Sequence, residues 1–281
     1  MPIRCKLLSM LALLAVAALA AAHPKLSSGP MIAYAEMTET AIWVQTTEDA
    51  EVSLRYWPIQ SAAESATIGP VRTNAANDHI ALLTVTGLPF GTKFGYEIRI
   101  DNQPVEFNHP LEFQTQPHWR WATNPPVPPE FTFALGSCAY INDTPFDRPG
   151  RPYGDGMQIF ESIHKLRPEL MLWMGDNVYF READWLTPSA MRYRWRQNRA
   201  LPEMQPLLAS TAHYAIWDDH DYGPNDSDWT FNLRPDALQI FREYFPSLQS
   251  GLPDTPGVFF RFVWGDVEFF MLDNRYHRTP N

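Results

Sequence analysis

The first part of the chain alternates apolar and polar residues at the spacing of antiparallel strands. Short β-branched and aromatic runs are separated by turn residues such as Gly87 and Pro89. These runs lie at residues 41–46, 51–57, 80–86, 93–100 and 111–115. Because such strands bury one face and expose the other, the pattern predicts a small β-sandwich over residues 23–115.

The pattern changes after a proline-rich stretch at residues 116–130, which we interpret as an interdomain linker. Apolar runs predict strands at 131–135, 169–174 and 213–217, and helical spacing predicts helices at 155–166, 188–201, 202–210 and 234–245. Strands that alternate with helices indicate a mainly parallel sheet in an α/β unit over residues 131–281. Runs at 258–264 and 267–273 flank Gly265 and predict a hairpin that joins the edge of this sheet.

Three of the predicted strands end in loops that carry metal-ligand side chains. The loops are Gly136-Ser137-Cys138, residues 175–179 and residues 218–221. The carboxyl ends of parallel strands meet at one edge of a sheet, so we expect these loops to form one polar site. Charged groups near a core are tolerated only when they are paired or coordinate a cation. The sequence therefore predicts a metal cluster.

The donor types in the first two loops indicate which cation is expected. A thiolate from Cys138, a carboxylate from Asp176 and a phenolate from Tyr179 suit a trivalent cation better than a lone Zn²⁺ or Mg²⁺. Each residue also has a plain structural interpretation: a tight turn, a helix cap or ring packing, respectively. Their joint occurrence favours the metal site.

The third loop places three carboxylates beside the imidazole of His220, directly after an apolar run. These carboxylates repel one another unless some of them bind cations and others accept hydrogen bonds. The simpler alternative is an acidic turn that is exposed to solvent. In a two-metal hydrolase a metal-activated water attacks phosphorus and a nearby histidine protonates the departing oxygen. His220 is the candidate for that proton donor.

The net charge of the chain limits which partners the protein can be expected to bind. The net charge is −10 and the isoelectric point is about 5.2, so nucleic acid is not expected as an obligate partner. The negative electrostatic field of the protein also repels phosphate esters. A site that binds them must therefore reverse the local potential with bound cations.

The amino terminus resembles an export signal. Basic residues are followed by an apolar run at 7–19 and an Ala-x-Ala site at 20–22, which predicts a cleaved signal peptide over residues 1–22 and a periplasmic or extracellular protein. The alternative is a membrane anchor, but the run is shorter than the roughly 20 residues that a span needs, and no transmembrane segment is expected elsewhere. Cys5 would leave with the signal, so Cys138 would be the only thiol and could form no intrachain disulfide.

Four segments resemble the alkaline phosphatase D, or PhoD-like, family of metallophosphoesterases. They are Phe133-Ala-Leu-Gly-Ser-Cys, Leu172-Trp-Met-Gly-Asp-Asn-Val-Tyr, Ile216-Trp-Asp-Asp-His-Asp and Phe270-Met-Leu-Asp-Asn-Arg. The stretch that begins at Val85 is similar to a fibronectin type III hairpin. The resemblance implies a fibronectin-III-like sandwich followed by an αββα catalytic domain. It also implies a phosphomonoesterase or phosphodiesterase that uses Fe³⁺ with Ca²⁺ or another divalent ion.

The resemblance also implies roles for single residues. Cys138 and Tyr179 match the family's iron ligands, and Asp176 matches its bridging carboxylate. Asp219 matches a metal-ligand position that is usually asparagine, and His220 matches the catalytic histidine. Two further residues in family-like segments, Asn225 and Arg275, are candidate substrate-binding residues.

One departure from the family pattern concerns the rest of the metal shell. The family completes it with later histidines and an aspartate, yet His277 is the only histidine after His220. We therefore expect the 281 residues to be the amino-terminal part of a longer enzyme, with an incomplete catalytic domain, weak metal binding and an exposed sheet edge. The oligomeric state is left open.

Three functions are compatible with these patterns. The main hypothesis is an exported metal-dependent phosphoric ester hydrolase. A non-catalytic secreted protein, in which the sandwich binds partners and the acidic loops hold structural Ca²⁺, is the second. The third is a thiol hydrolase with Cys138 as nucleophile, but a general base for it is not evident and the nearby aspartates would raise its thiol pKa.

Overall fold

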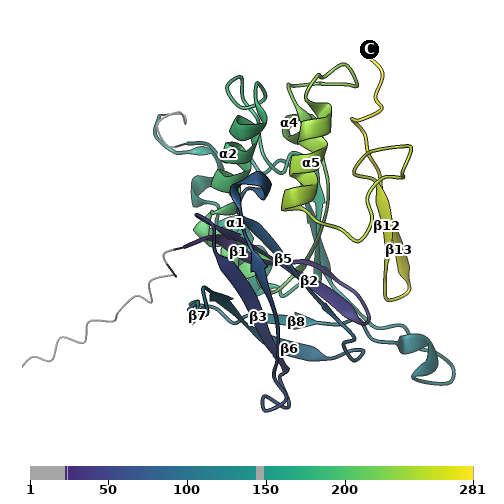
Figure 1. Cartoon of the computed structure of the whole chain (residues 1–281). Helices are drawn as coiled ribbons and strands as arrows, with labels where there is room; N and C mark the ends of the chain where they lie inside the picture. Colours follow the sequence, from purple (N-terminus) through teal and green to yellow (C-terminus); the bar gives the residue numbers. More distant parts are fainter. Residues whose placement is uncertain (1–22, 24, 144–148, 281) are drawn as a thin grey trace, which may run out of the picture.

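The computed structural model describes residues 23, 25–143 and 149–280. The predicted signal peptide lies outside them. Figure 1 shows the strands of the first half below helices α2 and α5, with the hairpin β12–β13 to one side. Among the described residues, no helix combines the length and the apolar character that crossing a membrane requires.

The amino-terminal half forms a β-sandwich. Its strands are β1 (Leu26–Ala35), β2 (Glu39–Thr46), β3 (Glu51–Pro58), β4 (Ala66–Arg72), β5 (Ile80–Thr86), β6 (Lys93–Ile100), β7 (Gln103–Pro104) and β8 (Glu112–Gln114). Five of them confirm the predicted runs, whereas β1, β4 and β7 were not predicted. Nearly every residue of β1 is buried, so this strand lacks the alternation that reveals a half-exposed strand. In β4, Gly69-Pro70 interrupts the β-branched run.

The second half alternates strands and helices as predicted. The parallel strands are β9 (Phe133–Gly136), β10 (Leu170–Met174) and β11 (Ala212–Ile216). The α-helices are α1 (Gln158–Lys165), α2 (Pro188–Arg199), α3 (Gln205–Leu208), α4 (Asp219–Tyr222) and α5 (Arg234–Tyr244). Helix α2 begins where the Thr187 side chain accepts a hydrogen bond from the Ala190 amide and Pro188 occupies the first turn. The helix predicted at 202–210 is split into a 3₁₀ turn, Pro202–Met204, and α3.

Both halves of the chain contribute to one six-stranded sheet. Its order is β5-β2-β1-β11-β10-β9, and β1 pairs in parallel with β11 through Ile32 and Ala212. The predicted linker also contacts both halves, because the Gln116 side chain donates hydrogen bonds to the carbonyls of Ala35 and Val263. The sandwich therefore packs against the second half through hydrogen-bonded backbone and through side chains.

The hairpin corrects one prediction. Strands β12 (Phe260–Trp264) and β13 (Val267–Met271) pair with each other in a separate two-stranded sheet, so the expectation that they join the main sheet edge is wrong. The Phe262 ring instead stacks on Tyr214 of β11 with centroids 3.8 Å apart. The Phe269 ring packs edge-on against Phe133 of β9. The hairpin therefore packs on the main sheet through aromatic rings and not through backbone pairing.

Candidate metal centre

The loops after β9, β10 and β11 meet at the carboxyl edge of the parallel strands, as predicted. The Cys138 amide donates to the Gly175 carbonyl at 3.2 Å, and the Ala139 amide donates to the Asp176 carbonyl at 2.9 Å. The Phe180 amide donates to the His220 carbonyl, also at 2.9 Å. Backbone hydrogen bonds thus hold the three loops together independently of any ligand.

Unusual backbone conformations shape this edge. Cys138 and Asp176 have φ values of 61° and 52°, in the left-handed region that non-glycine residues adopt at a cost. Gly175 has φ 98°, and a Cβ atom there would lie 2.7 Å from the Asp218 backbone nitrogen. The second and third loops can therefore approach this closely only because residue 175 is glycine.

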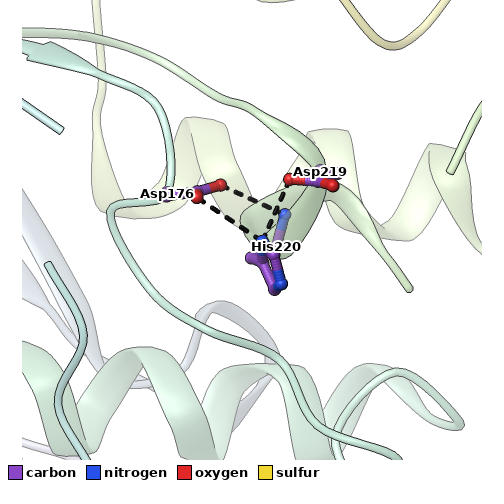
Figure 2. Close-up of side chains that lie close together, drawn as sticks. All are labelled: Asp176, Asp219 and His220. Atoms are coloured by element: carbon purple, nitrogen blue, oxygen red, sulfur yellow. Dashed lines mark hydrogen bonds and ion pairs between the residues drawn. The ribbon is translucent and has the colours of Figure 1, made fainter. Parts of the chain in front are cut away.

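Side chains converge on one carboxylate oxygen, Oδ2 of Asp176. The Tyr179 hydroxyl donates to it at 2.9 Å, the Cys138 Sγ lies 3.6 Å away, and His220 Nδ1 lies 3.4 Å away. His220 Nδ1 is also 3.0 Å from Oδ1 of Asp219, as Figure 2 shows. The structure thus brings together all five residues for which the sequence predicts a metal-binding or catalytic role.

The electrostatics of this cluster fit a bound cation. Burial, together with hydrogen bonds to Cys138 and Asp176, raises the pKa of Tyr179. Anionic donors this close together repel one another, and a multivalent cation offsets that repulsion. Asp176, Asp219 and His220 can each place a ligand atom within 4.8 Å of the others. The donor set therefore suits a metal ion.

Asp219 is kept ionised by its neighbours. Burial alone would raise the pKa of Asp219, but the hydrogen bond from the Asp226 amide and the charges of His220 and Arg275 outweigh burial and lower it. The Asp226 amide lies 2.7 Å from Asp219 Oδ2. Since one Asp219 oxygen faces His220 and the other this amide, the carboxylate has a fixed orientation.

The acidic segment 218–221, which the sequence predicted as a loop, instead begins a one-turn helix: Asp218 is the N-cap of α4, which covers Asp219–Tyr222. Asp218 and Asp221 form a reciprocal capping box at its start. Asp221 is fully buried and accepts hydrogen bonds from the amides of Asn177 and Asp218, and burial raises its pKa. Of the four consecutive ionisable residues, only Asp219 and His220 thus contribute side chains to the cluster.

The structure places the two candidate substrate-binding residues differently. Arg275 is buried, and its guanidinium contacts the Asp218 carboxylate, which also accepts a hydrogen bond from Asn274. Asn225 is exposed, and its side chain donates to the neighbouring Asp226. Substrate binding by either residue stays a prediction.

Sequence reasoning missed the supporting roles of Asn177, Asp218 and Asp221. Asn177 links the second and third loops, because its side-chain nitrogen donates to the Ile216 carbonyl at 2.8 Å and also contacts Asp221. The spacing of two aspartates three residues apart, directly after a strand, is a capping signal that could have identified Asp218 and Asp221.

The fold and the loops define an α/β protein with a candidate metal centre at its sheet edge. The model of the PhoD-like phosphatase family matches residues 133–281, more than half of the chain. The chain therefore belongs to the PhoD-like phosphatase family. A domain of unknown function, DUF7800, matches residues 23–118. No curated protein matches the chain.

Two solved structures share the fold. One, described as the structure of PhoD, has a TM-score of 0.71 and 17% identity, with 91% of this chain and 53% of that chain covered. The other is purple acid phosphatase PPD1 from yellow lupin (Lupinus luteus) seeds, with a TM-score of 0.55, 12% identity and coverage of 86% and 43%. This chain thus spans about half the length of the PhoD structure. The likeness confirms the predicted fold class, a β-sandwich followed by part of a metallophosphoesterase fold.

Proposed function

We propose that the protein is an exported, metal-dependent phosphoric ester hydrolase of the alkaline phosphatase D type. The observation that carries the proposal is the convergence of Cys138, Tyr179 and His220 on one oxygen of Asp176. A thiol, a phenol and a carboxylate at such short distances suit a trivalent cation. Membership of the PhoD-like phosphatase family supports the same chemistry.

Cys138, Asp176, Tyr179 and Asp219 are the residues that would hold Fe³⁺ with Ca²⁺ or another divalent ion. When bound, such cations supply positive charge for phosphoryl oxygens and lower the pKa of water. The protein's own contribution is to fix the donor atoms in advance, through the hydrogen bonds that tie the three loops together.

His220 is the proposed proton donor. Its Nδ1 lies 3.0 Å from Asp219 Oδ1, and this contact orients the ring. Nε2 is then the ring nitrogen that delivers a proton to the departing oxygen as the phosphorus–oxygen bond breaks. The Tyr179 ring packs against the imidazole with centroids 4.4 Å apart and restrains it further.

Visible absorption tests the proposed metal site. Phenolate bound to Fe³⁺ absorbs visible light, so iron-loaded protein should be coloured and Tyr179→Phe should lose that absorption. Tyr140→Phe is the matched control, because the Tyr140 ring packs on Tyr179 with centroids 4.8 Å apart and is not among the proposed ligands. Bound calcium with no bound iron would instead favour a non-catalytic calcium-binding protein.

Activity and export need separate measurements. The full-length, metal-loaded protein should hydrolyse p-nitrophenyl phosphate or its bis ester, and His220→Ala should lower kcat by about 10²- to 10⁴-fold, the usual contribution of general acid catalysis. Absence of turnover with bound metal would reject the enzymatic proposal. Export predicts a mature amino terminus at residue 23, which sequencing of the secreted protein would show.

A further inference from the structure

A cavity of about 290 Å³ adjoins the candidate metal centre, and the mechanism proposed above does not use it. Cys138 and Asp176, two of the candidate ligands, form part of its wall. Phe160 of α1 and Trp173 of β10 also line it, so the cavity extends from the loops into the space between sheet and helix. A phosphate ester bound at the metal centre would therefore have room beside its phosphate for its alcohol part.

The lining of this cavity is mainly apolar. Besides Phe160 and Trp173, it includes Met157, Ile159 and Ile163. Phe160 and Trp173 are 5% and 3% exposed and belong to the core, whereas Ile159 lines the cavity and is 58% exposed to solvent. The polar lining residues, such as Ser137 and Asn177, come from the loops, whereas a sugar or a nucleoside would also bury hydroxyl groups against the apolar side chains of α1 and β10, and that costs free energy. The lining thus favours an apolar alcohol.

A row of aromatic rings connects the cavity to the proposed proton donor. Tyr153 and Tyr140 both line the cavity, and their ring centroids are 5.1 Å apart. Tyr140 then packs edge-on against Tyr179, which contacts the His220 ring. An aryl or alkyl group held along these rings would keep its ester oxygen near His220, where a departing alcohol must be protonated.

We infer that this cavity binds the alcohol part of the substrate. The preferred substrates are then phosphate esters of compact apolar alcohols, aryl or short alkyl, in preference to sugar or nucleoside phosphates. Ile159 is a specificity-determining residue in this arrangement, because this residue contributes apolar surface to the lining of the cavity and is also exposed to solvent. The inference rests on the proposed function, since the phosphoryl group must be held at the metal centre.

Binding of two phosphonates to the metal-loaded full chain tests the inference without requiring turnover. Phenylphosphonate and methylphosphonate share an anionic head and differ in the apolar group. Titration calorimetry should show about tenfold tighter binding of phenylphosphonate, in the range expected for a small apolar group in a pocket. Ile159→Ser should reduce this ratio about threefold. Leu166→Ser is the matched control, because Leu166 is 76% exposed at the end of the same helix and does not line the cavity.

Hydrolysis provides a second measurement with a polar competitor of similar size. The kcat/KM for n-butyl phosphate should exceed that for glycerol 1-phosphate about tenfold. Equal kcat/KM values, equal affinities for the two phosphonates, or the same affinity ratio in Ile159→Ser and Leu166→Ser would each overturn the inference while leaving the proposed function intact. Failure to bind either phosphonate or to hydrolyse any ester would overturn the proposed function, and the inference with it.

Discussion

Asp176 occupies the centre of the site because a single oxygen of its carboxylate lies close to a thiol, a phenol and an imidazole. The left-handed backbone at Asp176, directly after Gly175, aims the side chain at this point. The geometry of the whole cluster therefore depends on a glycine that contributes no side chain of its own.

Replacing Gly175 should show this dependence. Gly175→Ala adds left-handed strain and a methyl group 2.7 Å from the Asp218 backbone, so we expect a loss of about 2–5 kcal/mol in unfolding free energy. Gly87→Ala is the matched control, because Gly87 has φ 71° with open space around the new methyl, and it should lose only about 1–2 kcal/mol. Equal losses in urea denaturation would contradict the steric argument.

Substitutions of Asp221 and Asp219 should have different effects, the first on the stability of the protein and the second on metal binding. Asp221→Ala removes the acceptor of two buried amides, and we expect it to cost roughly 2–4 kcal/mol of unfolding free energy. Asp219→Asn keeps the shape of the side chain and should change the stability of metal-free protein by less than about 1 kcal/mol, while weakening metal binding. Thermal denaturation and metal titration measure the two effects. A larger loss of stability in Asp219→Asn and a larger loss of metal affinity in Asp221→Ala would contradict the assigned roles.

The sequence predicted which residues gather at this site better than it predicted what each one does. Cys138, Asp176 and Tyr179 lie in the loops that follow β9 and β10, and the common edge of a parallel sheet brings such loops together. The acidic segment was harder to interpret, because Asp218, Asp219 and Asp221 share the same chemistry. Their spacing could have identified the capping pair Asp218 and Asp221, but only the structure shows which other groups they contact. Asp221 became a buried hydrogen-bond acceptor, and Asp218 a partner of Arg275.

At the scale of elements, strand β11 links the site to the core. It leads directly into α4, which carries Asp219 and His220, and its middle contains the buried residue His213. The Trp173 indole nitrogen donates to His213 Nδ1 at 2.9 Å, and His213 Nε2 lies 3.3 Å from the Leu207 carbonyl. The neutral imidazole, protonated on Nε2, satisfies both contacts.

His213 should make stability depend on acid pH. Burial, helped by the charge of Arg199, lowers its pKa to about 3. The stabilisation by the neutral ring is therefore fully present above the unfolded pKa of about 6.5 and is lost as the pH falls towards 3, by at most about 1.4 kcal/mol per pH unit. His213→Gln cannot be protonated, so its unfolding free energy should fall less steeply between pH 6 and 4. Parallel curves in urea denaturation would contradict this expectation.

Helices and strands were predicted correctly where the hydrophobic pattern was strongly periodic. The predictions failed where contacts with distant elements determine how a strand packs. Turn residues between the runs 258–264 and 267–273 predicted the hairpin correctly, but nothing local showed that its aromatic side chains would stack on a sheet face. Strand β1 escaped prediction for a related reason, since burial on both faces removes the polar positions that mark a half-exposed strand.

At the scale of the whole molecule, Asp78 ties the sandwich to the helices. It is buried, and its carboxylate accepts hydrogen bonds from Gln45 at 3.0 Å, from Arg196 of α2 at 2.9 Å and from Tyr244 of α5. Together with the pairing of β1 and β11, this contact couples the stability of the two halves of the chain.

Substitution of Asp78 should affect the whole chain. Asp78→Ala removes the acceptor of the buried Tyr244 hydroxyl and the partner of the Arg196 guanidinium, and should cost roughly 2–4 kcal/mol of unfolding free energy. Asp49→Ala is the control, because Asp49 is half exposed and pairs with His79 and Arg72 at the surface, where a loss below about 1 kcal/mol is expected. Far-ultraviolet dichroism and tryptophan fluorescence should report one coincident transition in urea. Two separate transitions would show that the halves unfold independently.

The pairing of β1 with β11 limits where the chain can be truncated or recombined. A polypeptide that began in the linker would leave one side of β11 bare, with backbone donors and acceptors free to recruit strands from other molecules. The amino-terminal half thus covers a sheet edge that would otherwise be open to association with other molecules.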